Sequence, residues 1–291
     1  MKNIILKANA KLNLFLDIVA KRADGYHELD SVMISIGIFD ELIFERTDTP
    51  GISISCDKEG FPLDKSNIIY KAADALMKAN GLDDKAGLNV TVKKNIPSQA
   101  GMGGGSADGA AALIAVDRLF ELDTPMDKLT ELGARIGADV PFCLKGGCQI
   151  CRGIGEKLSE TELEKELYFV VIKPQTAIST PKAYSDHDKL ISPVHKNITP
   201  MISALKSGDT KAIAKSLFNA FEQTINDSEI DKAKEALKSS GAEGVLMTGS
   251  GSAVFGVFEK YENAERAYNK LKEKSLEVYI CKSEKAGVQT I

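Results

Sequence analysis

The sequence predicts an α+β protein of two domains with a cleft between them. Alternating apolar and polar residues, typical of strands, recur in both halves of the chain, and helical patterns lie between them. The 291 residues are enough for two ordinary domains, and a hydrophobic content of 43% supports a packed core. The charged stretch Glu160–Glu166 separates the halves, so we expect one domain over residues 1–158 and another over residues 159–291.

The first domain is expected to begin with strands. Ile4–Leu6 and Leu12–Ile18 are predicted as a pair, and the alternation in the second strand places Lys11 and Asn13 together on the face opposite Leu12. Further strands are predicted at Val32–Ile38, Glu41–Glu45, Ile52–Cys56 and Leu88–Val92.

Two helices of this half carry signals at their ends. Asn67 is a suitable N-cap for a helix over Ile68–Ala79, which stops near Gly81. Thr124-Pro125 opens a second helix, and Gly137 closes it.

The second domain is expected to alternate strands and helices. The predicted strands are Leu167–Lys173, Gly244–Thr248, Ala253–Phe258 and Glu277–Cys281. The predicted helices lie across Pro200–Asn226, Ser228–Ser240 and Asn263–Lys274.

The segment Ala100–Ala110 reads AGMGGGSADGA and precedes an alanine-rich helical run. Glycine allows close approach to a ligand and positive φ, and a helix that begins at such a loop directs unpaired N–H groups at the same point. The segment therefore predicts a cradle for nucleotide phosphates. A P-loop is excluded because no lysine follows the glycines, and the dinucleotide fingerprint fails at Ser106, where a glycine should stand. The alternative is a flexible loop capped by Ser106.

The composition argues against membrane and nucleic-acid partners. The N-terminus lacks an apolar signal core and no apolar stretch is long enough to cross a bilayer, so we expect a cytoplasmic protein without a membrane partner. A net charge of −4 without a basic block argues against a nucleic-acid partner.

Five cysteines make a disulfide framework unlikely in that compartment. Cys143, Cys148 and Cys151 have the spacing of some iron–sulfur ligands. We expect instead that 147–152 is a strand, which points Cys148 and Cys151 to opposite faces, and that the three are buried thiols.

Five segments together resemble the three sequence motifs of the GHMP small-molecule kinases. These segments are Ala10–Leu16, Arg22–His27, Ile96–Ala107, Gly137–Phe142 and Met247–Val254. The resemblance covers essentially the whole chain and is strongest to the branch that phosphorylates 4-diphosphocytidyl-2-C-methyl-D-erythritol. It implies a GHMP-kinase-like fold with the active site between the domains. It also implies ATP-dependent phosphorylation of the 2-hydroxyl of that compound, in the non-mevalonate route to isoprenoid precursors.

The resemblance implies catalytic roles for Lys11 and Asp139. Phosphoryl transfer to an alcohol needs an acceptor for the hydroxyl proton and a cation beside that acceptor, while backbone donors and a metal hold the phosphates. From the residues alone, Asp139 is equally suited to cap a helix, and Lys11 is more often a solvated strand residue.

The resemblance also implies two binding sites. It assigns ATP contacts to Asn67, Lys94, Pro97, Ala100, Gly101, Met102, Gly103, Gly104, Gly105, Ser106 and Ala107. It assigns substrate contacts to Asn13, Tyr26, His27, Thr180, Tyr184, Gly249 and Ser250. Of these, Tyr26 would stack on the cytosine, His27 would hydrogen-bond to it, and Tyr184 would bring a second aromatic ring to it. We expect Mg²⁺ to accompany ATP, with Ser106 as its candidate ligand.

Two departures from the family pattern bear on the loop. Gln99 stands where a small residue is usual, and Gly104 and Gly105 replace serines found in many GHMP kinases, which puts the metal role of Ser106 in doubt.

Other functions stay open at this point. A homoserine-type or mevalonate-type kinase is the first alternative, and a non-catalytic nucleotide-binding regulator is the second. The expected partner is a small molecule, and the expected state is a monomer or weak homodimer.

Overall fold

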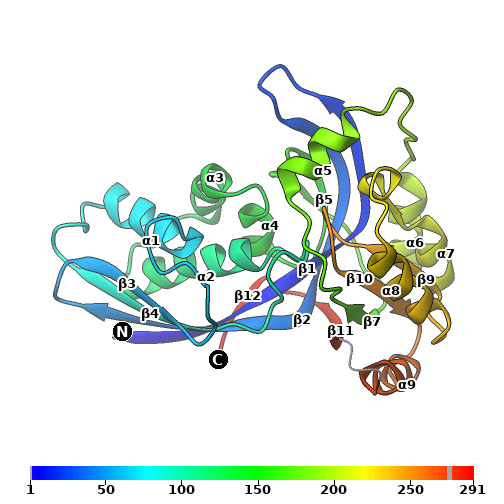
Figure 1. Ribbon diagram of the computed structural model, residues 1–291. Coiled ribbons are helices and arrows are strands. Elements are labelled where there is room, and N and C mark those ends of the chain that lie inside the picture. The colour runs from blue at the N-terminus through cyan, green and yellow to red at the C-terminus, as the bar shows by residue number, and fades with distance from the viewer. Residues whose placement is uncertain (1, 274–276) are drawn as a thin grey trace.

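The computed structural model describes residues 2–273 and 277–291, and its framework is one long antiparallel hairpin. The hairpin consists of β1 (Asn3–Lys21) and β2 (His27–Thr47) and extends through both lobes of the molecule (Figure 1). The expected pairing of Ile4–Leu6 with Leu12–Ile18 is therefore wrong, because both segments belong to β1. From residue 8 to residue 18 every residue of β1 is buried, so alternation in polarity does not mark an exposed face here.

The first lobe packs helices on the sheet, and Figure 1 shows α1 to α4 on one side of the strands. Its elements are β3 (Gly51–Cys56), α1 (Ile68–Ala79), β4 (Gly87–Lys93), α2 (Gly104–Leu119), α3 (Met126–Ile136), α4 (Val140–Lys145), β5 (Cys148–Gly153) and β6 (Lys157–Glu160). The predicted bounds of α1 are confirmed, and the Asn67 side chain accepts a hydrogen bond from the Ile69 amide at 2.8 Å. The predicted strands Val32–Ile38 and Glu41–Glu45 are both parts of β2.

The second lobe alternates strands and helices, as predicted. Its elements are β7 (Tyr168–Ile172), α5 (Thr180–His187), α6 (Thr199–Ser207), α7 (Thr210–Ser216), β8 (Phe218–Asn219), the 3-10 helix η1 (Ala220–Gln223), α8 (Ser228–Lys238), β9 (Gly244–Met247), β10 (Val254–Phe258), α9 (Tyr261–Lys272), β11 (Val278–Glu284) and β12 (Val288–Thr290). The prediction missed α5 and β12, and it placed helix across β8. The predicted end of the last helix, Lys274, lies outside the described residues.

The strands join into one sheet whose main order is β12-β1-β2-β11-β7-β10-β9. β11 pairs with both β2 and β7, and β12 returns to β1, where the Ile291 amide donates to the Ile5 carbonyl at 3.1 Å. The chain ends consequently lie near each other (Figure 1). A division of the chain into two domains at residue 158 stays a prediction. Strands from both sides of this position belong to the same sheet.

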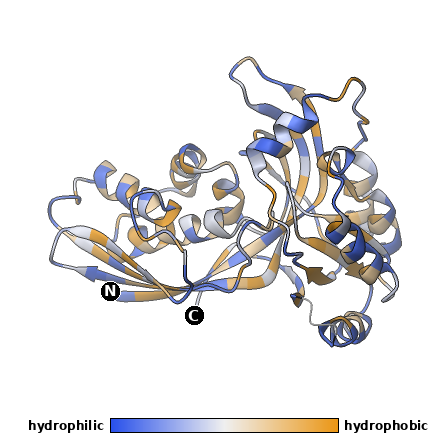
Figure 2. Ribbon diagram, in the orientation of Figure 1, coloured by the Kyte–Doolittle hydropathy of each residue, from blue (hydrophilic) through white to orange (hydrophobic). Residues whose placement is uncertain are grey.

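The hydrophobic residues lie mainly between the sheet and the helices that pack on it. Figure 2 shows hydrophobic residues along the strands and on helix faces turned toward them, whereas the tip of the β1–β2 hairpin is hydrophilic. Among the described residues, no helix has both the length and the apolar composition needed to cross a bilayer.

Cys143, Cys148 and Cys151 are buried free thiols. Burial raises the pKa of Cys148 to about 12 and that of Cys143 well above its usual value, which disfavours the thiolate that metal binding requires. Over residues 2–273 and 277–291, no group of three or more His, Cys, Asp or Glu side chains is placed to hold a metal ion. The iron–sulfur alternative therefore has no support in this part of the chain.

The turn between β11 and β12 fixes the end of α4. The Asn9 amide donates to the Gly287 carbonyl at 2.8 Å, and a Cβ added at Gly287 would lie 1.8 Å from the Cys143 carbonyl oxygen. We expect Gly287→Ala to lower the free energy of unfolding by about 2–3 kcal/mol, because neither backbone can give way easily. Urea unfolding followed by circular dichroism measures this loss.

Gly60→Ala is the matched control. No atom lies within 4 Å of an added Cβ there, and φ is +76°, so only conformational strain of about 1 kcal/mol is expected. An unfolding free energy for Gly287→Ala no lower than that of Gly60→Ala would contradict the close contact.

Candidate functional site

A cleft of about 1010 Å³ lies where the two lobes meet, at the upper end of the usual size for a small-molecule site. It is lined by Lys11, Asn13, Tyr26, His27, Asn67, Lys94, Pro97, Ala100, Gly101, Met102, Gly103, Gly104, Gly105, Ser106, Asp139, Thr180, Tyr184, Gly249 and Ser250 among other residues. These include every predicted site residue except Ala107. Ala107 is fully buried, and its amide donates to the Gly103 carbonyl at 2.9 Å, so it has no amide free for a ligand.

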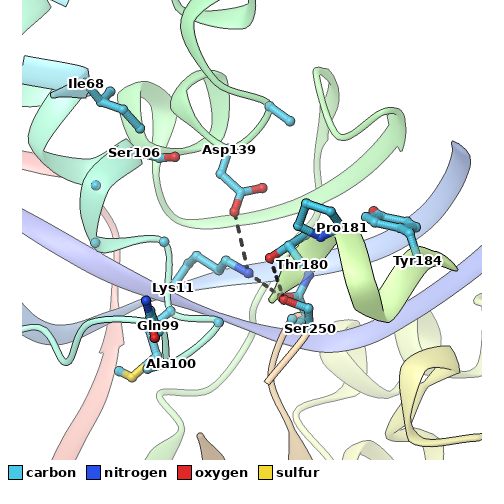
Figure 3. A pocket seen from close by; sticks show the side chains of 18 of the residues that line it. Lys11, Ile68, Gln99, Ala100, Ser106, Asp139, Thr180, Pro181, Tyr184 and Ser250 are labelled. Carbon is cyan, nitrogen blue, oxygen red and sulfur yellow. Dashed lines mark hydrogen bonds and ion pairs between the residues drawn. The ribbon is translucent and has the colours of Figure 1, made fainter. Parts of the chain in front are cut away.

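Lys11 lies at the centre of the site (Figure 3). Only 3% of the residue is exposed, which corrects the view of it as a solvated strand residue. Its ammonium donates to the Asn13 side-chain oxygen at 2.5 Å and lies 3.6 Å from the Asp139 carboxylate. Its backbone amide donates to the Met102 carbonyl at 3.0 Å, so β1 contacts the glycine loop directly.

Asp139 occupies the N-cap position of α4, but its side chain makes no capping hydrogen bond. The carboxylate extends toward Lys11 instead (Figure 3). Of its side chain, 29% is exposed, so one part of the group contacts the ammonium and another is open to the cleft. This geometry favours chemistry over helix capping.

The glycine loop contacts Lys11 and the turn after β9. Gly103 has φ +72°, and a Cβ there would lie 3.0 Å from Cγ of Lys11. A Cβ at Gly101 would lie 2.1 Å from the Thr248 carbonyl oxygen. A Cβ at Gly249 would lie 3.3 Å from the Lys11 ammonium. Glycine is therefore required where three distant segments converge.

The helix α2 begins at Gly104, with Gly103 in the left-handed region at its N-cap, so a cap by Ser106 is not observed. The amides at this end have no partners within the helix and face the cleft, as an anion site requires. Gln99 adopts φ +52°, a strained conformation for a residue with a side chain.

Asn67 and Lys94 line the same end of the cleft with their polar groups already bonded. The Asn67 side chain bonds the Ile69 amide and donates to the Pro62 carbonyl at 2.6 Å. The Lys94 ammonium contacts Asp40 and lies 2.7 Å from Asp108.

Aromatic rings occupy the opposite end. The His27 ring stacks on Tyr184 with centroids 4.5 Å apart, and Tyr184 packs edge-on against Phe221. Burial raises the pKa of Tyr184, so its hydroxyl stays neutral. Tyr26 also lines the cleft, and 59% of this residue is exposed. The hydroxyls of Thr180 and Ser250 are hydrogen-bonded to each other at 2.7 Å (Figure 3).

Sequence reasoning missed Asp188, which positions His27. The Asp188 carboxylate contacts Nε2 of His27 at 2.7 Å and the Lys21 ammonium at 2.6 Å. The hydrogen bonds from Lys21 and His27 lower the pKa of Asp188. Since 161 residues separate Asp188 from His27, no local pattern could have revealed the pair.

Two family models match the chain. GHMP kinases N terminal domain matches residues 67–147, and GHMP kinases C terminal matches residues 201–276. The first range contains the glycine loop and Asp139.

Curated relatives match nearly the whole chain. A 4-diphosphocytidyl-2-C-methyl-D-erythritol kinase of Caldicellulosiruptor bescii is 40% identical over 92% of this chain and 93% of its own. A kinase of the same name from Clostridium novyi is 38% identical over 96% of this chain and 100% of its own.

Solved structures share the fold. A crystal structure of 4-(cytidine 5'-diphospho)-2C-methyl-D-erythritol kinase has a TM-score of 0.82 and 29% identity, covering 96% of this chain and 99% of that one. Homoserine kinase from Cytophaga hutchinsonii has a TM-score of 0.80 at 18% identity, covers 100% of this chain and 98% of its own, and shows the fold alone. The predicted α+β architecture and the resemblance are confirmed, and the chain belongs to the GHMP kinase family.

Proposed function

We propose that the protein transfers the γ-phosphoryl group of ATP to the 2-hydroxyl of 4-diphosphocytidyl-2-C-methyl-D-erythritol, a step in the non-mevalonate formation of isoprenoid precursors. The names of the relatives support this substrate. The observation that carries the chemistry is the Lys11–Asp139 pair, which lies between the glycine loop and the aromatic end of one cleft.

In this mechanism the substrate oxygen attacks the γ-phosphorus while the bond to the β-phosphate oxygen breaks and ADP leaves. Asp139 accepts the hydroxyl proton, because its carboxylate is partly open to the cleft. The Lys11 ammonium orients that carboxylate and balances its charge. It also lies close enough to Gly103 to attract a phosphate held at the loop.

The amides at the start of α2 supply the donors for the phosphates. They are preorganised by backbone contacts to Lys11 and Thr248, so little reorganisation accompanies binding. Phosphoryl transfer depends mainly on such positioning and electrostatic stabilisation.

Mg²⁺ fits the donor set. Ser106 is the third residue of α2 and lines the cleft beside the glycine loop, so it offers one hydroxyl oxygen there. A few oxygen ligands suit Mg²⁺, which takes most of its ligands from nucleotide oxygens and water. When bound, the ion would neutralise charge on the phosphates, and Ser106 is the residue that would hold it.

The aromatic end suits the cytosine. Tyr26 is largely exposed and lines the cleft, as do the His27 and Tyr184 rings, which stack on each other. Burial of a base against such rings is favourable for a pyrimidine tail. A homoserine-type or mevalonate-type substrate would leave these rings unused, which is why the cytidyl substrate is preferred.

The remaining proposals concern the cellular location, the oligomeric state and the partners of the protein. A cytoplasmic location suits an ATP-dependent enzyme with free thiols. A monomer or weak homodimer acting without nucleic acid or membrane remains a prediction.

The first prediction concerns the reaction itself. Purified protein with Mg-ATP and the cytidyl substrate should release ADP in a coupled assay well above the rate without substrate. Homoserine and mevalonate, tested at the same concentration, should give much lower rates. No ADP release with the cytidyl substrate would contradict the proposed function, and faster turnover of another alcohol would change the substrate.

The second prediction separates chemistry from binding. Asp139→Asn should lower kcat by about 10²–10⁴-fold, because the amide cannot accept the hydroxyl proton. The dissociation constant for ATP, measured by calorimetry, should change little.

The control is Asp30→Asn, which removes an ion pair with Arg152 outside the cleft. It should leave kcat near wild type. Undiminished turnover in Asp139→Asn would remove Asp139 from its role as proton acceptor.

The third prediction tests the cytosine subsite. Tyr26→Ala should raise KM for the cytidyl substrate about tenfold, since loss of a base–aromatic stack costs about 1–3 kcal/mol. The KM for ATP should not change. Tyr261→Ala, at another half-exposed tyrosine outside the cleft, is the control and should alter neither constant. An equal rise in both KM values for Tyr26→Ala would argue against a cytosine contact.

A further inference from the structure

A chain of buried hydrogen bonds leads from Lys11 into the central hairpin. The Lys11 ammonium donates to Oδ1 of Asn13 at 2.5 Å, and Nδ2 of Asn13 donates to the Ser31 hydroxyl oxygen at 3.0 Å. The Ser31 hydroxyl donates in turn to the Phe15 carbonyl at 2.7 Å. Lys11, Asn13 and Ser31 are all buried, so water competes little for these contacts.

The direction of each bond in this chain is set by the chemistry of its two ends. The Phe15 carbonyl can only accept, so it takes the hydrogen of the Ser31 hydroxyl. The Ser31 oxygen is then left as an acceptor, which requires the NH₂ group of Asn13 to face it. The Lys11 ammonium can only donate, which requires the oxygen of Asn13 to face Lys11. Both neighbours therefore select the same orientation of the Asn13 side chain.

A bulge in the hairpin places Ser31 at the end of this chain. The register between β1 and β2 shifts between Asn13 and Phe15, so Leu14 has no opposite residue and Ser31 lies opposite Leu16. Bulges redirect side chains and are common beside active sites. Here the shift leaves Ser31 within reach of both the Asn13 side chain and the Phe15 carbonyl.

The backbone of Asn13 has a separate support. Its amide donates to Oγ1 of Thr248 at 3.0 Å, in the turn after β9. Loss of the Ser31 hydroxyl would thus leave the backbone in place and free the Asn13 side chain to turn. A turned side chain presents its NH₂ group to the Lys11 ammonium, and two donors repel each other. Of the two contacts described for the ammonium, only that with Asp139 at 3.6 Å would then remain.

We propose that Ser31 is a positioning residue that fixes the Asn13 side chain, so that the Asn13 oxygen holds the Lys11 ammonium beside Asp139. Ser31 is not among the residues that line the cleft, so it acts through Asn13 and Lys11. The part of this inference that concerns catalysis rests on the proposed function, whereas the orientation of Asn13 does not.

Ser31→Ala tests the proposal by kinetics. It should lower kcat about tenfold, the effect expected when a buried hydrogen-bond partner is lost and Lys11 is misplaced. The KM values for ATP and the cytidyl substrate should change less than about threefold, because Ser31 lies outside the cleft. Ser31→Cys keeps the volume but offers only a weak hydrogen-bonding sulfur, so it should lower kcat in the same way if the alanine variant fails to fold.

Ser35→Ala is the matched control. Ser35 lies on the same strand, directly opposite Lys11, and is also fully buried. Its hydroxyl has no hydrogen-bond partner among the described residues. The variant removes a buried hydroxyl without breaking a hydrogen bond, so kcat should stay within about twofold of wild type. A kcat as low as that of Ser31→Ala would show an effect of packing alone and would overturn the proposal.

A double variant tests whether Ser31 acts through Asn13. Asn13→Ala removes the acceptor of Lys11 and should itself lower kcat. Adding Ser31→Ala to it should lower kcat by less than about twofold more, because no side-chain amide is left to orient. A further loss of about tenfold would overturn the proposal, since two independent effects on kcat multiply.

Nuclear magnetic resonance of the wild-type protein gives a readout that does not involve ATP. Nuclear Overhauser effects from the Asn13 side-chain NH₂ hydrogens should be stronger to the β-hydrogens of Ser31 than to the ε-hydrogens of Lys11, because Nδ2 faces the serine. The opposite order would overturn the proposal even if no Ser31 variant folds.

The two measurements separate this inference from the proposed function. If the resonance data agree but the wild-type protein phosphorylates no alcohol, the orientation of Asn13 stands and the proposed function fails. If the wild-type protein is active and Ser31→Ala keeps its full kcat, the proposed function stands and Ser31 has no positioning role.

Discussion

A buried ammonium group determines how the site is built. Lys11 is almost inaccessible to water, and an unpaired charge there would be very costly, so acceptors must surround it. Asn13 on the same strand provides one and Asp139 at the start of α4 provides another. Asn13 is held in turn by a hydrogen bond to Ser31 on β2 at 3.0 Å. The charge of Lys11 therefore links the central hairpin to the helices of the first lobe.

The glycines follow from close packing around Lys11 and between the loop and the turn after β9. A Cβ at Gly103 would press on the Lys11 side chain, one at Gly101 would collide with the Thr248 carbonyl, and one at Gly249 would collide with the Gly101 carbonyl. The loop is thus held by protein contacts before any ligand binds, and its amides are preorganised for phosphate. Beneath it, Lys94 and Asp108 hold the start of α2, so the cradle is fixed from both sides.

Local signals predicted the parts of this arrangement that local chemistry controls. The Asn67 cap, the glycine-rich entry to α2 and the family motifs around Lys11 and Asp139 were all visible in the sequence. The sequence did not show that β1 and β2 are each one continuous strand. The middle of β1 is buried on both faces, so its pattern of polar and apolar residues does not separate an exposed face from a buried one. The pairs His27–Asp188 and Lys94–Asp40 were also hidden, since each joins residues far apart in the sequence that only the tertiary fold brings together.

The central claim is that Lys11 and Asp139 lie where the two substrates meet. The most direct measurement is a crystal structure with a non-hydrolysable ATP analogue and 4-diphosphocytidyl-2-C-methyl-D-erythritol. The account predicts the γ-phosphate at the start of α2, with the 2-hydroxyl in hydrogen-bonding reach of the Asp139 carboxylate and the cytosine at Tyr26. A γ-phosphate bound away from Lys11, or a 2-hydroxyl remote from Asp139, would contradict it.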